Sequence, residues 1–148
     1  MTRDIYARLV SARKTPVLGS IAYYILKLLG VEIPRSVVVG DGLELAHGGF
    51  GVVIHSASTI GARVKIYPGV TLGRADIYRP IEQSKFKGIV IEDDSILCPG
   101  AKILCKEGIL TVGKGSVIGA NAVLLESTGE NEIWAGMPAR CVGTRDGK

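Results

Sequence analysis

Aromatic side chains are scarce in this sequence. Phe, Trp and Tyr make up 5% of the 148 residues, whereas hydrophobic residues reach 47% and glycine occurs 20 times. The core must therefore be built from Ile, Val, Leu and Ala, with glycine at many tight corners. The length suits one compact domain with its own core. This composition favours a regular, repeating backbone.

Metal ligands and disulfide pairs are also few. The chain has two histidines and three cysteines, and Cys98, Cys105 and Cys141 form no C-x-x-C pair and have no histidine nearby at zinc-ligand spacing. We therefore expect no metal site. Small buried free thiols are typical of a reducing compartment, so we expect a cytoplasmic protein.

The sequence lacks a long hydrophobic run and a block of one charge. The most apolar stretch, residues 16–30, is broken by Lys27 and falls short of the roughly 20 residues that span a bilayer. The N-terminus has no secretory pattern, so we expect a soluble protein. The net charge is +4, but 18 basic residues are interleaved with 14 acidic ones, which argues against nucleic acid as a partner.

Aliphatic residues recur every six positions over most of the chain. A period of six fits neither an α-helix nor a long alternating strand, but it does fit short strands joined by similar corners, with every sixth side chain pointing inward. The thirteen in-phase positions are Ile33, Val39, Leu45, Ile54, Ile60, Ile66, Leu72, Ile91, Leu97, Ile103, Val112, Ile118 and Leu124.

This pattern resembles that of the hexapeptide-repeat proteins. The resemblance implies a mostly β protein, a left-handed parallel β-helix with three hexapeptides in each triangular coil. We expect this acyltransferase domain to span residues 31–143, interrupted by a long loop at residues 73–88, with a frayed tail at 144–148.

Residues 1–30 have helical rather than six-residue spacing. Pro16 and Gly19 separate two apolar stretches, which predicts a short N-terminal helical segment packed on the first coil. A second interpretation stays open. The same face, with Arg3, Arg8, Arg13 and Lys14 nearby, would rest on a membrane that carries a lipid-linked substrate.

Four segments together resemble the serine acetyltransferase branch of the acyl-CoA-dependent hexapeptide transferases: "VEIPRSVVVGDGLELAHGG", "VKIYPGVTLG", "VIGANAVLL" and "WAGMPARCVG". In that branch the histidine of the L-x-H segment is the general base, which is His47 here. Imidazole has an ordinary pKa of about 6.5 and suits removal of a hydroxyl proton at neutral pH. The resemblance pairs this histidine with a carboxylate fifteen residues earlier, which is Glu32. That carboxylate would orient the ring.

Two departures from the family pattern concern the acceptor. Ala46 stands where the family has an aspartate that holds the amino group of serine, and the stretch "KFKGIVI" lacks a second family histidine. The variant pattern resembles the sugar-modifying relatives. It favours acetylation of a sugar hydroxyl in polysaccharide precursor biosynthesis for capsule or exopolysaccharide, with Arg74 and Arg79 of the loop as substrate-binding residues. A merely solvated loop is the alternative.

The resemblance also implies acetyl-CoA as the co-substrate, lying between subunits of a homotrimer. Small corner residues would let the pantetheine reach the backbone, and basic side chains would bind the phosphates. Pro99 departs from the pattern because it has no N–H to donate. The implied cofactor residues are Gly73, Pro99, Gly100, Ala101, Gly119, Ala120, Lys114 or Lys102, and Arg140.

Several functions remain open at this point. The favoured one is an acetyl-CoA-dependent O-acetyltransferase acting on a sugar hydroxyl. The alternatives are a serine O-acetyltransferase, an amino-sugar N-acetyltransferase and a non-catalytic β-helix scaffold. A carbonic anhydrase of the same fold needs three histidines around its metal, and the chain has only His47 and His55. We expect His55 to be structural.

Overall fold

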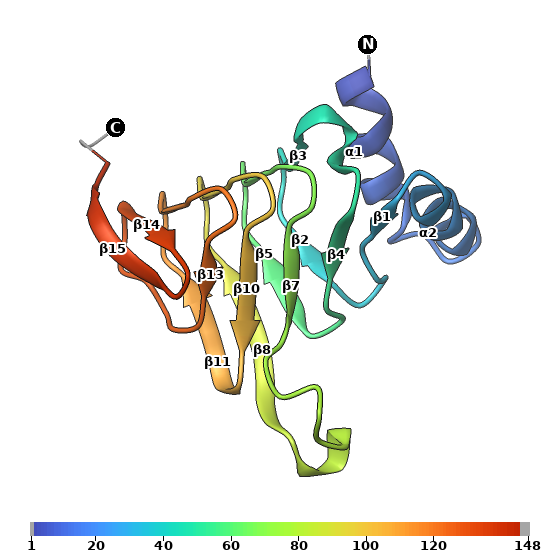
Figure 1. Cartoon of the computed structure of the whole chain (residues 1–148). Coiled ribbons are helices and arrows are strands. Elements are labelled where there is room, and N and C mark those ends of the chain that lie inside the picture. Colours follow the sequence, from blue (N-terminus) through green and yellow to red (C-terminus); the bar gives the residue numbers. More distant parts are fainter. Residues whose placement is uncertain (1, 146–148) are drawn as a thin grey trace.

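The computed structural model describes residues 2–145, which form a three-sided coil of parallel strands with helices at one end (Figure 1). The helices are α1 (Thr2–Ala12) and α2 (Leu18–Leu28). Each turn of the coil then contributes one short strand to each of three sheets. The last turn ends in an antiparallel pair, while all other strand pairs are parallel.

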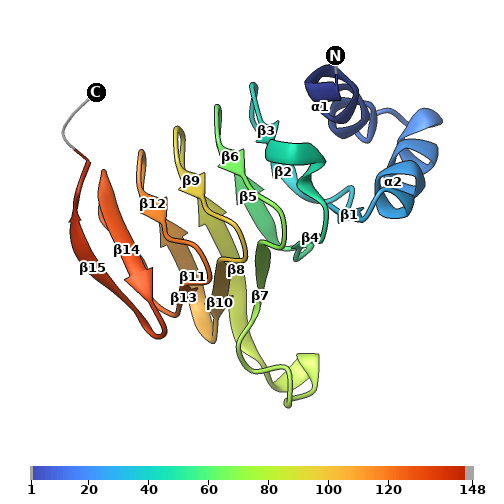
Figure 2. The same cartoon turned by 45° about the horizontal axis from the view of Figure 1, so that its top comes forward.

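The three sheets form the sides of the coil. The first sheet contains β1 (Val31–Glu32), β4 (Val52–Ile54), β7 (Thr71–Arg74), β10 (Lys102–Cys105) and β13 (Val123–Leu124). The second contains β2 (Val38–Val39), β5 (Ser58–Ile60), β8 (Lys85–Ile91) and β11 (Glu107–Val112). The third contains β3 (Glu44–Leu45), β6 (Lys65–Ile66), β9 (Ile96–Leu97), β12 (Val117–Ile118), β14 (Glu132–Gly136) and β15 (Ala139–Thr144). Figure 2 shows the strands of successive turns stacked side by side.

The six-residue period corresponds to one inward side chain per strand. All thirteen in-phase positions are buried, with between 0 and 6% of their surface exposed. Strand register stacks equivalent residues, so that Leu72 pairs with Ile54 on one side and Ile103 on the other. Burial of these aliphatic rows is the main favourable term for the coil. The predicted mostly β fold, a left-handed parallel β-helix with a short N-terminal helical segment, is confirmed.

Close contact between turns explains why small residues follow many of the inward positions. A Cβ added at Gly40 would lie 2.6 Å from the backbone carbon of Gly61 in the next turn. Real side chains do not tolerate that separation, so Gly40 is required by the packing of one turn on the next.

Both ends of the hydrophobic interior are covered. At one end Arg13, almost fully buried, donates hydrogen bonds from Nη1 to the carbonyls of Ile33 and Pro34. At the other end β14 and β15 form the antiparallel pair, and Trp134 is buried against the core. β15 extends to Thr144, one residue into the predicted tail, and residues 146–148 lie outside the described part. Within residues 2–145, neither helix has the length and apolar character needed to cross a bilayer.

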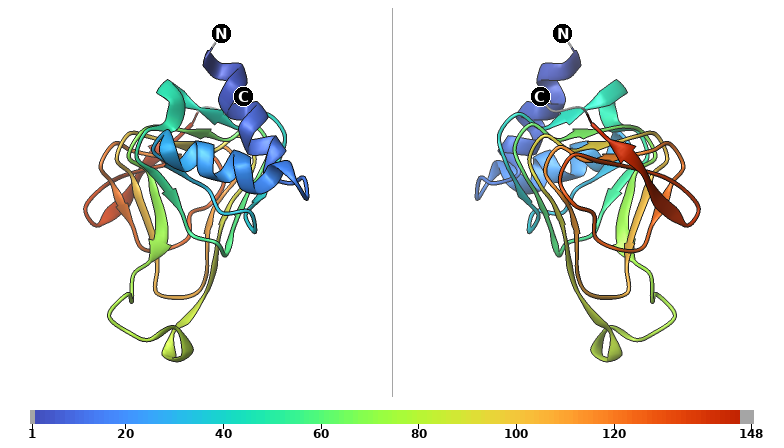
Figure 3. Two further views of the ribbon diagram at one scale, coloured as in Figure 1. Left: turned by 90° about the vertical axis from the view of Figure 1, so that its right-hand side faces the viewer. Right: turned by 90° about the vertical axis from the view of Figure 1, so that its left-hand side faces the viewer.

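The corners between sheets fall into three stacked rows. The His47 row, where the third sheet passes into the first, consists of residues 46–51, 67–70, 98–101 and 119–122. The loop row, between the first and second sheets, consists of residues 33–37, 55–57, 75–84, 106 and 125–127. The Arg63 row, between the second and third, consists of residues 40–43, 61–64, 92–95 and 113–116. Looking along the coil, the long loop projects from the side opposite the short helix at residues 46–49 (Figure 3).

The long loop is anchored by a buried carboxylate at its base. Asp76, only 2% exposed, accepts hydrogen bonds from Arg74 Nε at 2.9 Å and from the Ser84 hydroxyl at 2.7 Å. Arg74 also donates to the carbonyl of Arg79. These hydrogen bonds, that from Arg74 first, lower the pKa of Asp76 below its usual value. The unpaired part of the loop, residues 75–84 with η2 (Ile81–Gln83), is therefore held at both ends.

We predict that Asp76 gives the fold a specific pH dependence. Because its pKa is lower in the folded chain than the roughly 3.9 of an unfolded aspartate, its stabilisation is complete above about pH 4 and is lost as the pH falls further. Asp76→Asn should be less stable than wild type in urea unfolding at pH 7, and the difference should shrink towards pH 3. Glu82→Gln, an exposed change in the same loop, is the control. A difference that stays constant over this range would contradict the assignment.

Candidate active site

His47 lies on a sharp corner where β3 ends. The chain turns outward in a short 3-10 segment, η1 (Ala46–Gly49), and His47 has a φ of 51° and Gly48 a φ of 77°. A non-glycine residue in this left-handed region costs on the order of 1–3 kcal/mol. The conformation ends the strand after the buried Leu45 and exposes the imidazole. The break of nine residues after Leu45 in the repeat corresponds to this insertion.

A tyrosine of α1 forms one wall beside this corner. A Cβ added at Gly48 would lie 2.7 Å from Tyr6 Oη, so only glycine allows the tyrosine to approach. On another side Tyr67, directly after the inward Ile66, places its ring centroid 6.2 Å from that of His47. The corner is thus enclosed by side chains from three separate parts of the chain.

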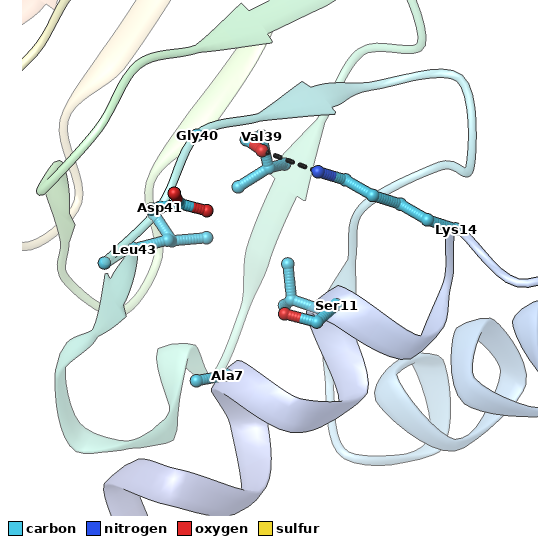
Figure 4. Close-up of a pocket in the computed structure, with 9 residues that line it drawn as sticks. Ala7, Ser11, Lys14, Val39, Gly40, Asp41 and Leu43 are labelled. Atoms are coloured by element: carbon cyan, nitrogen blue, oxygen red, sulfur yellow. Dashed lines mark hydrogen bonds between the residues drawn. The ribbon is translucent and has the colours of Figure 1, made fainter.

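The resulting cavity is large enough for a small substrate. It measures about 490 Å³ and is lined by Tyr6, Glu44, Leu45, Ala46, His47, Gly48 and Tyr67. Glu44 forms an ion pair with Lys65, with 3.2 Å between Oε2 and Nζ. A second cavity between α1 and residues 39–43 is only about 90 Å³, and Lys14 crosses it to donate a hydrogen bond to the carbonyl of Val39 (Figure 4). The cavity at His47 is the stronger candidate site.

Glu32, the predicted partner of His47, has different contacts in the structure. Its Oε1 lies 3.4 Å from Lys27 Nζ and 3.4 Å from Tyr23 Oη, both on α2. Across residues 2–145 the structure contains no hydrogen bond between Glu32 and His47. The orienting role of Glu32 therefore stays a prediction.

The predicted acceptor residues do not gather around His47 within one chain. Ala46 lines the cavity, but Arg74 and Arg79 lie at the other end of the first sheet, towards the loop row. Gly73, which was predicted to bind the cofactor, lies at that end as well. The Arg74 guanidinium is committed to Asp76 and to backbone carbonyls, whereas Arg79 is exposed.

Most predicted cofactor residues share the His47 row. Pro99, Gly100 and Ala101 lie one turn from Tyr67, and Gly119 and Ala120 lie one turn further. A Cβ added at Gly69 would be 3.6 Å from the Gly100 backbone, which shows how closely these turns stack. The N–H groups of Gly100 and Ala101 already donate to the carbonyls of Pro68 and Cys98. A ligand that lies along this row would therefore hydrogen-bond to other backbone groups, such as carbonyls, rather than to the N–H groups of Gly100 and Ala101.

The basic residues predicted for phosphates are dispersed. Lys114 lies in the Arg63 row, and Arg140 lies on β15 with Nη1 3.9 Å from a carboxylate oxygen of Glu126. Lys102 is nearer the His47 row, where its Nζ donates to the carbonyl of Gly69. Within one chain only Lys102 is close to the small corner residues.

His55 packs at the base of the long loop. Its Nδ1 accepts a hydrogen bond from the Ala57 N–H at 3.1 Å, and its ring lies edge-on to Phe86 at 4.7 Å. Burial, and secondarily the charge of Arg74, lowers the pKa of His55, which favours the neutral ring at pH 7. These contacts agree with a structural role.

Sequence reasoning missed three residues of the cavity. Glu44 and Tyr67 flank inward positions, so their outward direction follows from the repeat, but nothing in the period marks them as neighbours of His47. Tyr6 carries no sequence signal because it reaches the corner from a helix outside the repeat. No group of three or more His, Cys, Asp and Glu side chains within residues 2–145 could hold a metal ion. Of the cysteines only Cys105 is buried, while Cys98 is partly and Cys141 fully exposed, so the expectation of buried thiols is wrong for two of them.

Comparison with known proteins identifies relatives of this chain. No family model matches it. The serine acetyltransferase of Bacillus pumilus is 36% identical over 113 residues, covering 76% of this chain and 48% of the relative. That of Staphylococcus aureus is 36% identical over 122 residues, covering 80% and 53%. The chain spans about half the length of the curated relatives it matches.

Solved structures agree with these sequence matches. Serine acetyltransferase from Brucella abortus superposes with a TM-score of 0.73 at 29% identity, over 95% of this chain and 55% of that one. A serine acetyltransferase solved in complex with CoA has a TM-score of 0.66 at 31% identity, over 84% and 48%. A hexapeptide-repeat serine O-acetyltransferase from Brucella melitensis has a TM-score of 0.71 at 30% identity, over 95% and 54%.

These matches contradict the predicted sugar O-acetyltransferase of polysaccharide biosynthesis. Relatives at 35–40% identity are named serine acetyltransferases, which supports the alternative stated with that prediction. The error came from equating the loss of two family side chains, at Ala46 and in "KFKGIVI", with loss of amino-acid recognition, although the cavity contains other polar groups. The chain has a hexapeptide-repeat acetyltransferase fold that is related to serine acetyltransferase.

Proposed function

We propose that this protein is an acetyl-CoA-dependent O-acetyltransferase that acetylates the hydroxyl of serine, with His47 as the general base. The observation that carries the proposal is the exposed imidazole at the mouth of a cavity of about 490 Å³. The relationship to serine acetyltransferases, among them structures with CoA, serine and cysteine bound, supports both the cofactor and the acceptor.

The chemistry follows from the position of the imidazole. A serine hydroxyl is a weak nucleophile until a base removes its proton. His47 takes that proton as the oxygen attacks the thioester carbonyl carbon of acetyl-CoA. The C–S bond then breaks, the acetyl group stays on the serine oxygen, and the imidazolium returns the proton to the leaving thiolate. Acetyl-CoA supplies the activated acyl group along the His47 row, beside Pro99, Gly100 and Ala101.

The complete site requires more than one copy of the chain. His47 lies at the corner where the strands of the first sheet begin, while Arg79 lies in the loop at the corner where they end. Figure 3 shows the short helix at residues 46–49 and the long loop on opposite sides of the coil. They belong to one site only if the loop of a second copy meets the His47 row of the first. We infer a homotrimer in which the outer face of the first sheet, with Val53 43% exposed, turns towards the threefold axis.

The helical segment adds a surface for a membrane. A row of apolar side chains along the outer face of α2 is exposed: Leu18, Ile21, Tyr24, Ile25 and Leu28. Of the basic side chains in residues 1–30, Arg13 is buried, whereas Arg8, Lys14 and Lys27 are exposed. Apolar side chains flanked by basic groups fit the headgroup region of an anionic lipid surface, so we propose peripheral contact there.

The role of His47 predicts a large loss of activity in His47→Ala. General-base catalysis typically contributes about 10²–10⁴-fold to the rate, so CoA release from acetyl-CoA with serine should fall by that factor. Glu130→Ala, an exposed change in the segment between β13 and β14, should keep wild-type activity. If His47→Ala released CoA at the wild-type rate, another residue would have to be the general base. If the wild type itself released no CoA with serine, the non-catalytic scaffold would be favoured.

The trimer can be tested by mass and by one charged substitution. Sedimentation equilibrium of wild type should give three times the chain mass of 15.6 kDa. Val53→Glu should dissociate the assembly and abolish serine-dependent CoA release, because its charge would face the axis. Val38→Glu, at a residue of the second sheet that is more exposed than Val53, should leave both unchanged. A monomeric wild type, or dissociation by Val38→Glu instead, would contradict the arrangement.

Membrane contact can be measured by flotation with lipid vesicles. The wild type should bind vesicles containing phosphatidylglycerol more strongly than neutral phosphatidylcholine vesicles, and added salt should weaken binding because it screens the basic groups. The double variant Ile21→Glu and Leu28→Glu should lose binding, whereas Ile109→Glu, distant on β11, should retain it. Equal binding of both variants, or a larger oligomer held together through α2, would rule out the membrane assignment.

A further inference from the structure

Three polar side chains of the cavity at His47 make no hydrogen bond with any residue in the described part of the chain. They carry the imidazole of His47 and the phenol hydroxyls of Tyr6 and Tyr67. His47 is exposed, whereas both tyrosines are half-buried. A polar group that is partly removed from water and lacks a partner costs free energy, so a ligand that supplies the partner gains affinity.

The groups that this cavity offers to a ligand are hydrogen-bond donors. Glu44 is the one carboxylate among the lining side chains, and it is already engaged: Lys65 Nζ lies 3.2 Å from its Oε2, and its Oε1 is fully buried. A phenol is a better donor than acceptor, because the ring withdraws electron density from the oxygen. Hydrogen bonds from such donors to a carboxylate are roughly twice as strong as those to a neutral group. The cavity therefore favours an anionic group of the ligand.

The hydroxyl of Tyr6 lies against the corner that carries His47. A Cβ added at Gly48 would lie 2.7 Å from Tyr6 Oη, 2.9 Å from Cζ and 3.1 Å from Cε2, so the hydroxyl end of the ring faces the corner. A short carbon chain joins the hydroxyl of serine to its carboxylate. Groups that bind these two ends must lie close together, as Tyr6 and His47 do.

The position of Tyr6 is fixed by the way α1 is attached to the coil. Directly after α1, the buried Arg13 donates hydrogen bonds to two backbone carbonyls of the first turn. Lys14 donates to the carbonyl of Val39 at 3.0 Å (Figure 4). Tyr6 itself packs against the hydrophobic core. A donor held in place loses little further freedom when a ligand binds, so more of its hydrogen bond appears as affinity.

We propose that Tyr6 is a specificity-determining residue whose hydroxyl donates a hydrogen bond to the carboxylate of the acceptor. This inference rests on the proposed serine acetyltransferase function and adds a group that recognises the amino acid. Ala46 provides no polar side chain next to His47, so a helix outside the repeat supplies one. The acceptor hydroxyl then extends towards His47, which removes its proton, and a hydroxy acid is selected over a simple amino alcohol.

The test compares two acceptors that differ in one group. Serine carries the carboxylate, and ethanolamine lacks it but keeps the hydroxyl and the ammonium group. In wild type, kcat/KM measured by CoA release should be far higher for serine. In Tyr6→Phe, kcat/KM for serine should fall about 10- to 100-fold, mainly through KM, because a hydrogen bond to a charged group is lost. The value for ethanolamine should not fall. If ethanolamine is acetylated too slowly to follow, its inhibition constant against serine gives the same comparison.

Three further variants separate binding of the carboxylate from packing. Gly48→Ala keeps the tyrosine but displaces its hydroxyl, so it should lose the preference for serine even if both acceptors react more slowly. Tyr67→Phe removes the other phenol hydroxyl of the cavity and should keep the wild-type ratio of the two kcat/KM values. Tyr24→Phe, the same change at an exposed position on α2, should behave as wild type.

The outcomes distinguish this inference from the proposed function. If wild type releases no CoA with either acceptor, the proposed function fails and the inference fails with it. If serine is acetylated but wild type does not prefer it to ethanolamine, or Tyr6→Phe slows both acceptors equally, the transferase stands and the role of Tyr6 is overturned. Loss of the preference in Tyr67→Phe but not in Tyr6→Phe would also overturn it, because the other hydroxyl would then bind the carboxylate.

Discussion

The stacking of one aliphatic side chain per strand, turn upon turn, is the constraint on which the rest of this structure depends. Each strand contributes an inward residue such as Leu72, held between Ile54 and Ile103 in register. The thirteen inward positions of the period are all aliphatic, and successive turns approach one another too closely for a side chain at positions like Gly40. Chemistry is therefore confined to the outer faces and to the three rows of corners.

The corners differ because the chain departs from the period in different ways. Insertion of η1 lifts His47 out of the coil, while the longer insertion at residues 75–84 is tied down by Asp76 and extends away on the opposite side. The Arg63 row has no such insertion, and there the bidentate pair of Arg63 and Asp94 links successive turns. A site that needs both insertions must combine two copies of the chain, which is the physical argument for the proposed trimer.

The sequence was sufficient to predict the fold but only part of the candidate site. The period placed thirteen side chains inside correctly because in a β-helix each position's environment depends mainly on its own phase. His47 was identified through the L-x-H segment of the resemblance to serine acetyltransferases. The cavity around it could not be recognised, since Tyr6 comes from a helix without the repeat, and the neighbour of Glu44 is Lys65, one full turn later. The prediction of a sugar acceptor was wrong for the same reason. It relied on family side chains that this chain lacks, because the sequence does not reveal which side chains the next turn of the coil brings close to His47.

The two N-terminal helices contribute both to the cavity at His47 and to the exposed apolar surface. α1 packs against β3 and η1 on one side and against α2 on the other, so Tyr6 forms a wall of the cavity while the apolar row of α2 faces outward. Only glycine at position 48 permits that approach, which means that the corner and the helix have to fit each other. A shift of α1 would move the Tyr6 wall relative to His47 without changing any residue of the coil. The size of the cavity at His47 is therefore determined by how the helices are held at the end of the β-helix, and not by the repeat alone.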